Sequence, residues 1–197
     1  MNDADLIKKY LDGDINSFNT LVWRWEKPLY NFSVRFLGDT ELAKDVTQKA
    51  FIKAYKNLKG LKDPSKFSSW IYQITSNLCK DEFKSMKRHQ SISLELMMEN
   101  HKDHRFDLAD SSLPDPSADM NQIELEELIK RALQSIPVEQ RIVIIMKEYQ
   151  GLKFAEIAET LGESINTVKS RMYYGLNALR KVFNRWNINE EVLQYEM

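Results

Sequence analysis

Apolar residues recur at helical spacing along most of this chain, and no segment alternates apolar and polar residues as a β-strand would. The clearest series has four-residue steps and comprises Leu42, Val46, Ala50 and Ala54. It predicts one amphipathic helix from Glu41 to Leu58. Further helices are predicted over residues 18–37, 67–87, 123–136 and 138–149. Because only 6 Gly and 5 Pro interrupt these segments, we predict an all-α protein.

The predicted helix over 18–37 differs from the others in its aromatic content. Aromatic side chains fall on more than one side of it, at Trp23, Trp25, Phe32 and Phe36. A helix that is apolar on several sides is typical of the centre of a bundle. Pro28 lies inside the segment, where it is expected to kink or divide the helix.

An acidic stretch with two prolines separates two groups of helices. Residues 90–121 contain "DSSLPDPSADM" and hold 2 Lys and Arg against 7 Asp and Glu. Residues 1–89 hold 16 basic against 11 acidic side chains, and residues 122–186 hold 10 against 8. Such a stretch is typical of an extended linker, and the basic blocks favour polyanion contact. We therefore predict two small helical bundles, 1–89 and 122–186, joined by an acidic linker at 90–121 and followed by an acidic tail at 187–197.

Membrane, secreted and catalytic proteins have signatures that this sequence lacks. No apolar run is long enough to span a bilayer and no signal-peptide core is present, so we expect a cytoplasmic protein. The single Cys79 cannot form an internal disulfide. His101 and His104 have no second cluster of ligands beside them, so neither a metal nor another cofactor is expected. No nucleophile with its base and no glycine-rich phosphate loop indicates an enzyme.

The segment "FAEIAETLGESINTVKSR", residues 154–171, has the pattern of two crossed helices. Ala158 is small enough to let the second helix approach, Gly162 suits a positive φ, and Ser164 is an expected N-cap. The second helix is expected to bury Ile165, Val168, Met172, Leu176 and Leu179. It is expected to expose Asn166, Thr167, Lys169, Ser170 and Arg171. These exposed side chains favour a DNA-binding helix-turn-helix over a generic helical hairpin, which stays the alternative.

The helix over 67–87 gathers cations toward its end, at Lys80, Lys84, Lys87 and Arg88. The helix dipole accounts for one or two of them. Four cations favour contact with phosphates.

Taken together, the two blocks resemble the extracytoplasmic-function group of bacterial RNA polymerase sigma factors. The group's second conserved region is matched, in order, by "GDINSF", "LGDTELAKDVTQKAFIKAYKNL" and "FSSWIYQITSNLCKDEF". Its fourth is matched by "LQSIPVEQRIVIIMKEYQGLKFAEIAETLGESINTVKSR". The resemblance implies a non-enzymatic promoter-specificity subunit that binds core RNA polymerase, recognises the minus-ten and minus-thirty-five elements and starts transcription.

The resemblance also implies three sets of site residues. The clamp helices of the polymerase's largest subunit would be bound by Asp45, Gln48, Lys49, Phe51, Ile52 and Tyr55, and the flap of the second-largest subunit would be a further contact. The minus-ten element would be read and melted by Lys62, Lys66, Phe67, Trp70, Tyr72, Gln73, Asn77, Lys80, Lys84, Lys87 and Arg88. The minus-thirty-five element would be read by Asn166, Thr167, Lys169, Ser170, Arg171, Tyr173 and Tyr174. In the second set, Asn77 matches a base-contacting asparagine and Trp70 an aromatic at the melting edge, although a helical Trp is more often part of a core.

Several positions depart from the family pattern. Lys49 stands where Glu is common, Gln73 where Arg is common, and Asn166 where Gly is usual. Tyr174 and Leu176 also replace arginines, which removes about two cationic contacts and predicts a weak or unusual upstream element. A second DNA-bound protein that recruits this factor would compensate.

Some alternatives stay open at this stage. The acidic linker either enters the polymerase's active cleft in place of RNA or is a solvated spacer. An anti-sigma protein is a typical family partner, but no segment of this sequence indicates its binding site. A free-standing regulator would bind a palindrome as a dimer without polymerase, and an interaction protein would hold polymerase without reading DNA.

Overall fold

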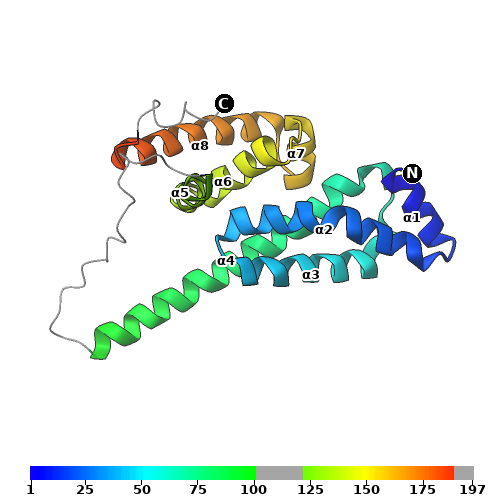
Figure 1. Cartoon of the computed structure of the whole chain (residues 1–197), viewed down its shortest axis with the longest axis horizontal. Helices are drawn as coiled ribbons and strands as arrows, with labels where there is room; N and C mark the ends of the chain where they lie inside the picture. Colours follow the sequence, from blue (N-terminus) through cyan, green and yellow to red (C-terminus); the bar gives the residue numbers. More distant parts are fainter. Residues whose placement is uncertain (101–121, 189–197) are drawn as a thin grey trace.

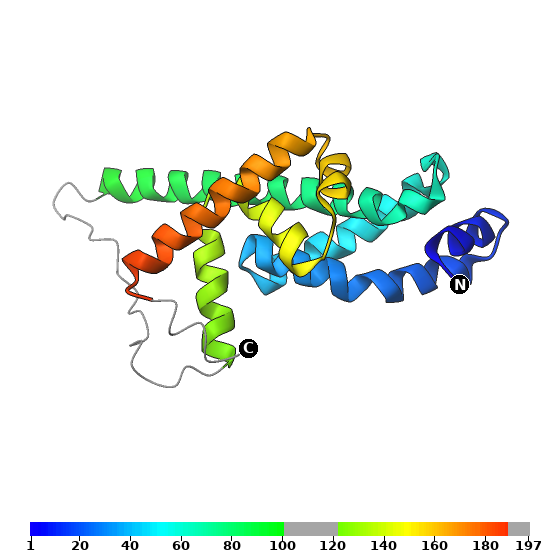
Figure 2. The same ribbon diagram turned by 90° about the horizontal axis from the view of Figure 1, so that it is seen from above.

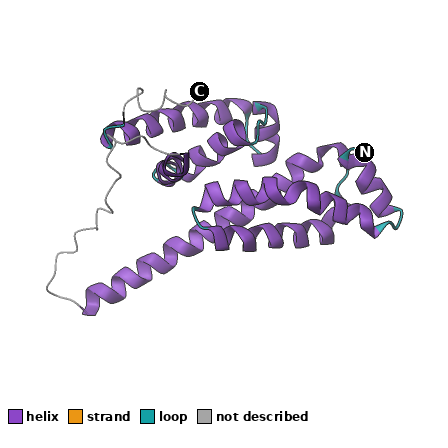
Figure 3. Cartoon of the chain, in the orientation of Figure 1, coloured by secondary structure: helices purple, strands orange, loops and turns teal. Residues whose placement is uncertain are grey.

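The computed structural model describes the backbone of residues 1–100 and 122–188 and the side chains of residues 1–88 and 125–188. Within these ranges every regular element is a helix, as the sequence predicts (Figure 3). The helices form two bundles, one on each side of the gap, and the second bundle lies across one side of the first (Figures 1 and 2). None of the described helices combines the length and apolar content needed to cross a lipid bilayer.

Four helices build the first bundle. They are α1 (Asp3–Leu11), α2 (Ile15–Leu37), α3 (Thr40–Asn57) and α4 (Phe67–Asn100), with two short 3-10 turns, η1 (Leu58–Gly60) and η2 (Pro64–Lys66), before α4. The connection between α2 and α3 is specified locally. Gly38 ends α2 with a φ of 76°, and the Asp39 carboxylate then accepts the backbone N–H groups of Glu41 and Leu42 at 2.9 Å.

The core of this bundle lies between α2, α3 and α4. Phe32 and Phe36 of α2 are fully buried in the same cluster as Ala50 and Ala54 of α3. A fully buried Leu or Phe contributes about 1.5 to 3 kcal/mol. Cys79 of α4 lies in the same core, where burial raises the pKa of its thiol to about 12.

Two expectations for α2 are corrected. The helix is not divided at Pro28, since it continues as one element from Ile15 to Leu37. Trp23 is not part of the core, because it is 85% exposed. The buried residues of α2, such as Leu21 and Leu29, lie on one side of the helix, and Trp23 is out of step with them.

The long helix α4 corrects the expected linker boundary. The prediction ended this helix at Lys87 and began an extended linker at residue 90, whereas α4 continues to Asn100. Residues 90–100 contain no Gly or Pro and several strong helix formers, so nothing in them ends the helix. The two prolines, Pro114 and Pro116, lie beyond it. The rest of the expected linker, 101–121, and the residues 189–197 of the acidic tail lie outside the described residues.

The second bundle contains the predicted helix-turn-helix. Its elements are α5 (Gln122–Gln134), α6 (Val138–Ile144), the π-helical turn η3 (Ile145–Tyr149), α7 (Phe154–Leu161) and α8 (Ile165–Arg185). Gly162 ends α7 with a φ of 67°. The Ser164 hydroxyl accepts the backbone N–H of Thr167 at 3.0 Å. Both turn residues therefore have the roles that the sequence predicts.

The buried face of α8 differs from the prediction at two positions. Val168 and Met172 are buried as expected, but Ile165 and Leu176 are 43% and 47% exposed. The buried stripe passes through Gly175 instead of Leu176. A Cβ atom on Gly175 would lie 2.8 Å from Cδ1 of Ile144, so the absence of a side chain there is what lets α8 approach α6.

Candidate nucleic-acid and polymerase interfaces

One exposed stripe along α4 carries five of the eleven residues predicted to read the minus-ten element. Gln73, Asn77 and Lys84 are exposed and follow one another at spacings that place them on a single helix face. Lys87 and Arg88 extend the stripe and are also exposed. The stripe therefore offers an amide to a base edge and cations to a phosphate backbone.

The aromatic residues near this stripe have different surroundings. Trp70 is half-buried, with its ring 5.9 Å from that of Phe67. Phe67 and Tyr72 are buried, at 1% and 3% exposure, and Tyr72 packs edge-on against Trp25. Burial raises the pKa of the Tyr72 hydroxyl, which donates a hydrogen bond to Gln150 of the second bundle. In this structure Phe67 and Tyr72 therefore do not present their rings at the surface, whereas Trp70 is partly exposed.

The loop before α4 holds two further predicted cations, Lys62 and Lys66. Asp63 accepts the backbone N–H of Ser65 at 3.0 Å and so shapes the turn. Lys62 is exposed. Lys66 is also exposed, but its ammonium group is paired with Glu159 of the second bundle.

The polar face of α3 matches the predicted polymerase contact. Asp45, Gln48, Ile52 and Tyr55 are exposed, and Phe51 is half-buried. Lys49 is exposed too, and its ammonium group forms an ion pair of 2.7 Å with Glu82 of α4. The hydrogen bond to Glu82 raises the pKa of Lys49. The cation that departs from the family pattern is thus balanced within the bundle and adds little net charge to this face.

Trp23 is a residue of this face that sequence reasoning assigned to the core. It lines a pocket of about 760 Å³ between α2 and α3, together with Gln48, Phe51 and Ile52. Large apolar side chains exposed next to one another mark protein-binding surfaces. The signal in the sequence was the position of Trp23, which is out of step with the buried residues of α2.

The exposed side of α8 that is predicted to read the minus-thirty-five element is more aromatic than the exposed stripe of α4. Asn166, Lys169 and Ser170 are exposed. Tyr173 and Tyr174 are 66% and 61% exposed, with their rings 5.6 Å apart. Two further predicted residues have partners within the protein: Thr167 contacts the Ser164 hydroxyl at 2.8 Å, and Arg171 pairs with Glu163 at 2.8 Å.

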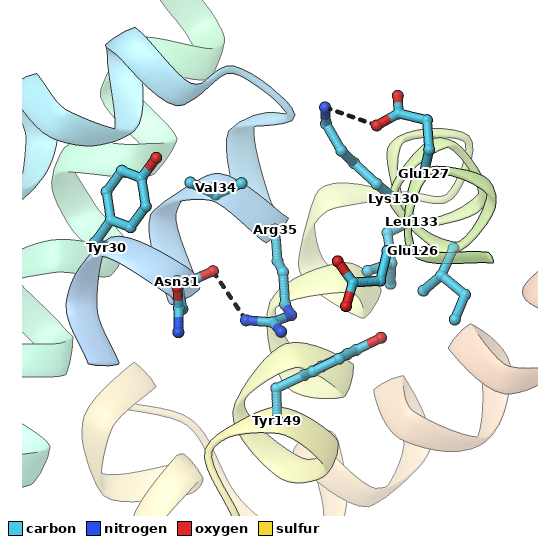
Figure 4. Close-up of a pocket in the computed structure, with 10 residues that line it drawn as sticks. Tyr30, Asn31, Val34, Arg35, Glu126, Glu127, Lys130, Leu133 and Tyr149 are labelled. Atoms are coloured by element: carbon cyan, nitrogen blue, oxygen red, sulfur yellow. Dashed lines mark hydrogen bonds and ion pairs between the residues drawn. The ribbon is translucent and has the colours of Figure 1, made fainter. Parts of the chain in front are cut away.

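A pocket of about 510 Å³ separates α2 from α5 and η3 at one edge of the contact between the bundles (Figure 4). The guanidinium of Arg35 lies over the ring of Tyr149, 4.2 Å from its centre, and donates to the carbonyl of Asn31 at 3.4 Å. Lys130 pairs with Glu127 on the α5 side. The sequence analysis did not predict any contact between the bundles, because the apolar pattern of each bundle can be satisfied by its own helices.

Models of two conserved families match the two bundles separately. Sigma-70 region 2 matches residues 21–89, and Sigma-70 region 4 matches residues 126–179. The ECF RNA polymerase sigma factor SigW of Bacillus subtilis (strain 168) is 32% identical over 176 residues, which cover 89% of this chain and 93% of SigW. The chain belongs to the ECF group of RNA polymerase sigma factors.

Two solved structures share the fold of this sigma factor. The structure of CnrH in complex with the cytosolic domain of CnrY has a TM-score of 0.67 at 22% identity and covers 93% of this chain and 97% of that one. The sigma factor RpoE in complex with the anti-sigma factor NepR from Bartonella quintana has a TM-score of 0.58 at 20% identity, covering 93% and 100%.

Membership of the family establishes the function. The protein is a promoter-specificity subunit, not an enzyme, and its two sigma regions bind core RNA polymerase and the minus-ten and minus-thirty-five promoter elements. The histidines weighed as a metal site, His101 and His104, lie outside the described residues. Among the side chains that are described, no three potential ligands gather as a metal site would require.

Proposed function

We propose that this sigma factor opens minus-ten DNA with the exposed stripe of α4 and holds an unpaired base between Asn77 and Trp70. The proposal rests on the exposed amide of Asn77, which lies on the same helix face as Lys84 within the region 2 match. An unstacked base needs a hydrogen-bonding partner for its edge and an aromatic surface for its face. The cations farther along α4 would track the phosphates of the same strand.

The polymerase contact would be made by the face formed by α2 and α3. The polar residues Asp45 and Gln48 set the register on the clamp helices, while Trp23 and Ile52 supply apolar area. Because Lys49 is already paired with Glu82, its positive charge does not repel a basic partner as an isolated lysine would. We assign polymerase binding and minus-ten reading to residues 1–89.

The second bundle, residues 122–186, would read the upstream element weakly. The exposed face of α8 offers Lys169 and two tyrosines, whereas a helix with more cations would bind phosphates more tightly. A recruiting protein bound nearby on the DNA would supply the missing affinity. The relative RpoE is solved with an anti-sigma factor, and we propose an inhibitor of the same class for this chain. A protein with these partners would act in the cytoplasm.

The deciding experiment is run-off transcription on a genomic fragment library with core RNA polymerase. Wild-type protein should produce new transcription start sites, and Asn77→Ala should abolish most of them because the flipped base loses its partner. Asn16→Ala is the matched control, since Asn16 is also an exposed asparagine of the first bundle, on α2. Equal transcription by Asn77→Ala and Asn16→Ala would contradict the role of Asn77. Tight binding to DNA without polymerase, with no new start sites, would favour a free-standing regulator.

A further inference from the structure

Helix α1 packs against the loop that precedes α4. It lies beside the 3-10 turn η2, the last element before α4, and both are at the same end of the first bundle in Figures 1 and 2. The match to Sigma-70 region 2 begins at residue 21, so α1 lies outside it. Neither that match nor the sequence analysis assigns a role to α1, although it touches a segment that is predicted to read minus-ten DNA.

Two features hold α1 in place on the bundle. Leu6 and Ile7 are fully buried and belong to the hydrophobic core. A capping box closes the start of the helix, in which the Asn2 side chain accepts the backbone N–H of Asp5 at 2.9 Å. Neither feature involves the side chain of Asp3. The contacts of that side chain are therefore additional to those that hold α1 on the bundle.

The carboxylate of Asp3 binds two side chains of α2. Its Oδ2 atom accepts the indole N–H of Trp25 at 3.0 Å, and its Oδ1 atom is paired with the guanidinium of Arg24. The Asp3 side chain is 20% exposed and Trp25 is half-buried. The indole N–H can only donate, and a charged acceptor makes a stronger hydrogen bond than a neutral one. Because a hydrogen bond is directional, it fixes the orientation of Trp25 in a way that apolar packing alone does not.

Trp25 in turn packs against the start of α4. Its ring lies edge-on against Phe67, the first residue of α4, with the ring centres 6.0 Å apart, and against Tyr72 at 5.6 Å. Phe67 is 1% exposed, and its ring lies 5.9 Å from that of Trp70. Close-packed side chains transmit a displacement to their neighbours, because little free volume separates them. A continuous series of contacts therefore joins Asp3 of α1 to Trp70, the aromatic residue of the proposed base pocket.

We propose that Asp3 is a positioning residue for promoter opening. Its carboxylate orients Trp25, and Trp25 acts through Phe67 to hold Trp70 in the arrangement that captures an unpaired base. The aromatic surface must be in place before the base unstacks, because a ring that is ordered only on binding lowers the affinity for the base. The inference rests on the proposed capture of a base between Asn77 and Trp70.

Substitution of Asp3 in the intact chain tests this role, on promoters that the run-off experiment identifies. Asp3→Ala removes the acceptor of the Trp25 N–H and should slow open-complex formation by the holoenzyme about fivefold, as expected for the loss of one hydrogen bond. Asp3→Asn keeps an oxygen acceptor for the indole and should stay within about twofold of the wild type. Opening is followed by the reaction of unpaired thymines with permanganate.

Asp12→Ala is the matched control, because it removes an equal charge at an exposed position just after α1. It should open promoters at the wild-type rate. Binding of each variant to core polymerase should be unchanged, as a folded first bundle requires.

Combination with Trp70→Leu separates positioning from a general loss of stability. If Asp3 acts through Trp70, the two substitutions are not additive, and Asp3→Ala should change the opening rate by less than about 1.5-fold in the Trp70→Leu protein. A substitution that merely loosens α1 would slow opening by the same factor in both backgrounds. Equal effects in the two backgrounds would therefore overturn the action of Asp3 through Trp70.

The same variants distinguish the failure of this inference from the failure of the proposed function. Slow opening by Trp70→Leu, together with wild-type opening by Asp3→Ala, would leave base capture standing and refute the role of Asp3. Wild-type opening by Trp70→Leu would refute base capture by that ring, and with it the role of Asp3 in capture. An Asp3→Asn protein as slow as Asp3→Ala would show that the hydrogen bond to Trp25 is not the contact that matters.

Discussion

The two helices predicted to bind DNA, α4 and α8, differ in chemistry and in how they are held. α4 presents an amide and several cations on a helix whose inner side is fixed by the large aromatic core of the first bundle. α8 presents two adjacent tyrosines and an exposed leucine, on a helix whose position depends on the close approach at Gly175. The comparison predicts that minus-ten recognition is electrostatic and robust in this chain, whereas upstream recognition is weaker and sensitive to packing.

Replacing Gly175 should have the largest effect, because it disrupts the packing that holds α8 against α6. Gly175→Leu forces a side chain into the space filled by Ile144 and pushes α8 away from α6. We expect the free energy of unfolding of the second bundle to fall by about 2 to 3 kcal/mol, measured by urea denaturation.

The exposed neighbour Tyr174 provides the control for that substitution. Tyr174→Leu introduces the same side chain on the solvent side of α8 and should change stability by less than about 0.5 kcal/mol. Equal destabilisation by the two leucines would show that the close contact of α8 with α6 is not needed.

Removing cations from α4 should have the next largest effect. Lys84→Gln with Lys87→Gln should weaken holoenzyme binding to promoter DNA by on the order of tenfold at physiological salt and lower the slope of log affinity against log salt by about 2. Lys8→Gln with Lys9→Gln, on exposed positions of α1, is the control of equal charge. If both pairs lower the slope equally, only net charge matters and α4 has no special role.

Adding cations to α8 should strengthen its predicted binding to the upstream element. Tyr174→Arg with Leu176→Arg restores the arginines that the family pattern carries. We expect upstream-element affinity to rise about fivefold and its salt slope to steepen by up to about 2. Asn184→Arg, at an exposed position near the end of α8, should leave both quantities nearly unchanged. An unchanged affinity for the double variant would mean that α8 does not meet DNA backbone at these positions.

Local patterns predicted the helices and the helix-turn-helix because their determinants are close in sequence. The cap at Ser164 and the positive φ at Gly162 need only their immediate neighbours. Predictions of exposure failed where a neighbouring residue, and not the expected apolar one, makes the contact between helices. Leu176 fits the apolar period of α8, but the adjacent Gly175 makes the contact with α6. Trp23 was assigned to the core because it is aromatic, although its position relative to the buried residues of α2 places it on the exposed side of the helix.

The sequence analysis named exposed residues of the candidate site, but it did not predict which of the aromatic residues in that site are buried. The exposed positions of Asn77 on α4 and Lys169 on α8 agree with the sequence analysis. Their roles in DNA binding stay predictions. The burial of Phe67 and Tyr72 was not predicted, because an aromatic residue in a helix has the same one-letter pattern whether it faces a core or a ligand.

The sequence by itself determined the fold class, the two sigma regions and the polar side chains available to DNA, because periodicity, caps and motifs are local properties of the chain. Only the tertiary structure decided that Arg141 is buried against the Phe36 carbonyl and that Glu139 lies between Lys80 and Arg171. These partners are tens of residues apart, or over a hundred in the case of Arg141 and Phe36. A charged residue reads as solvent-facing until a distant backbone carbonyl or carboxylate is placed beside it, and that placement depends on how the two bundles pack.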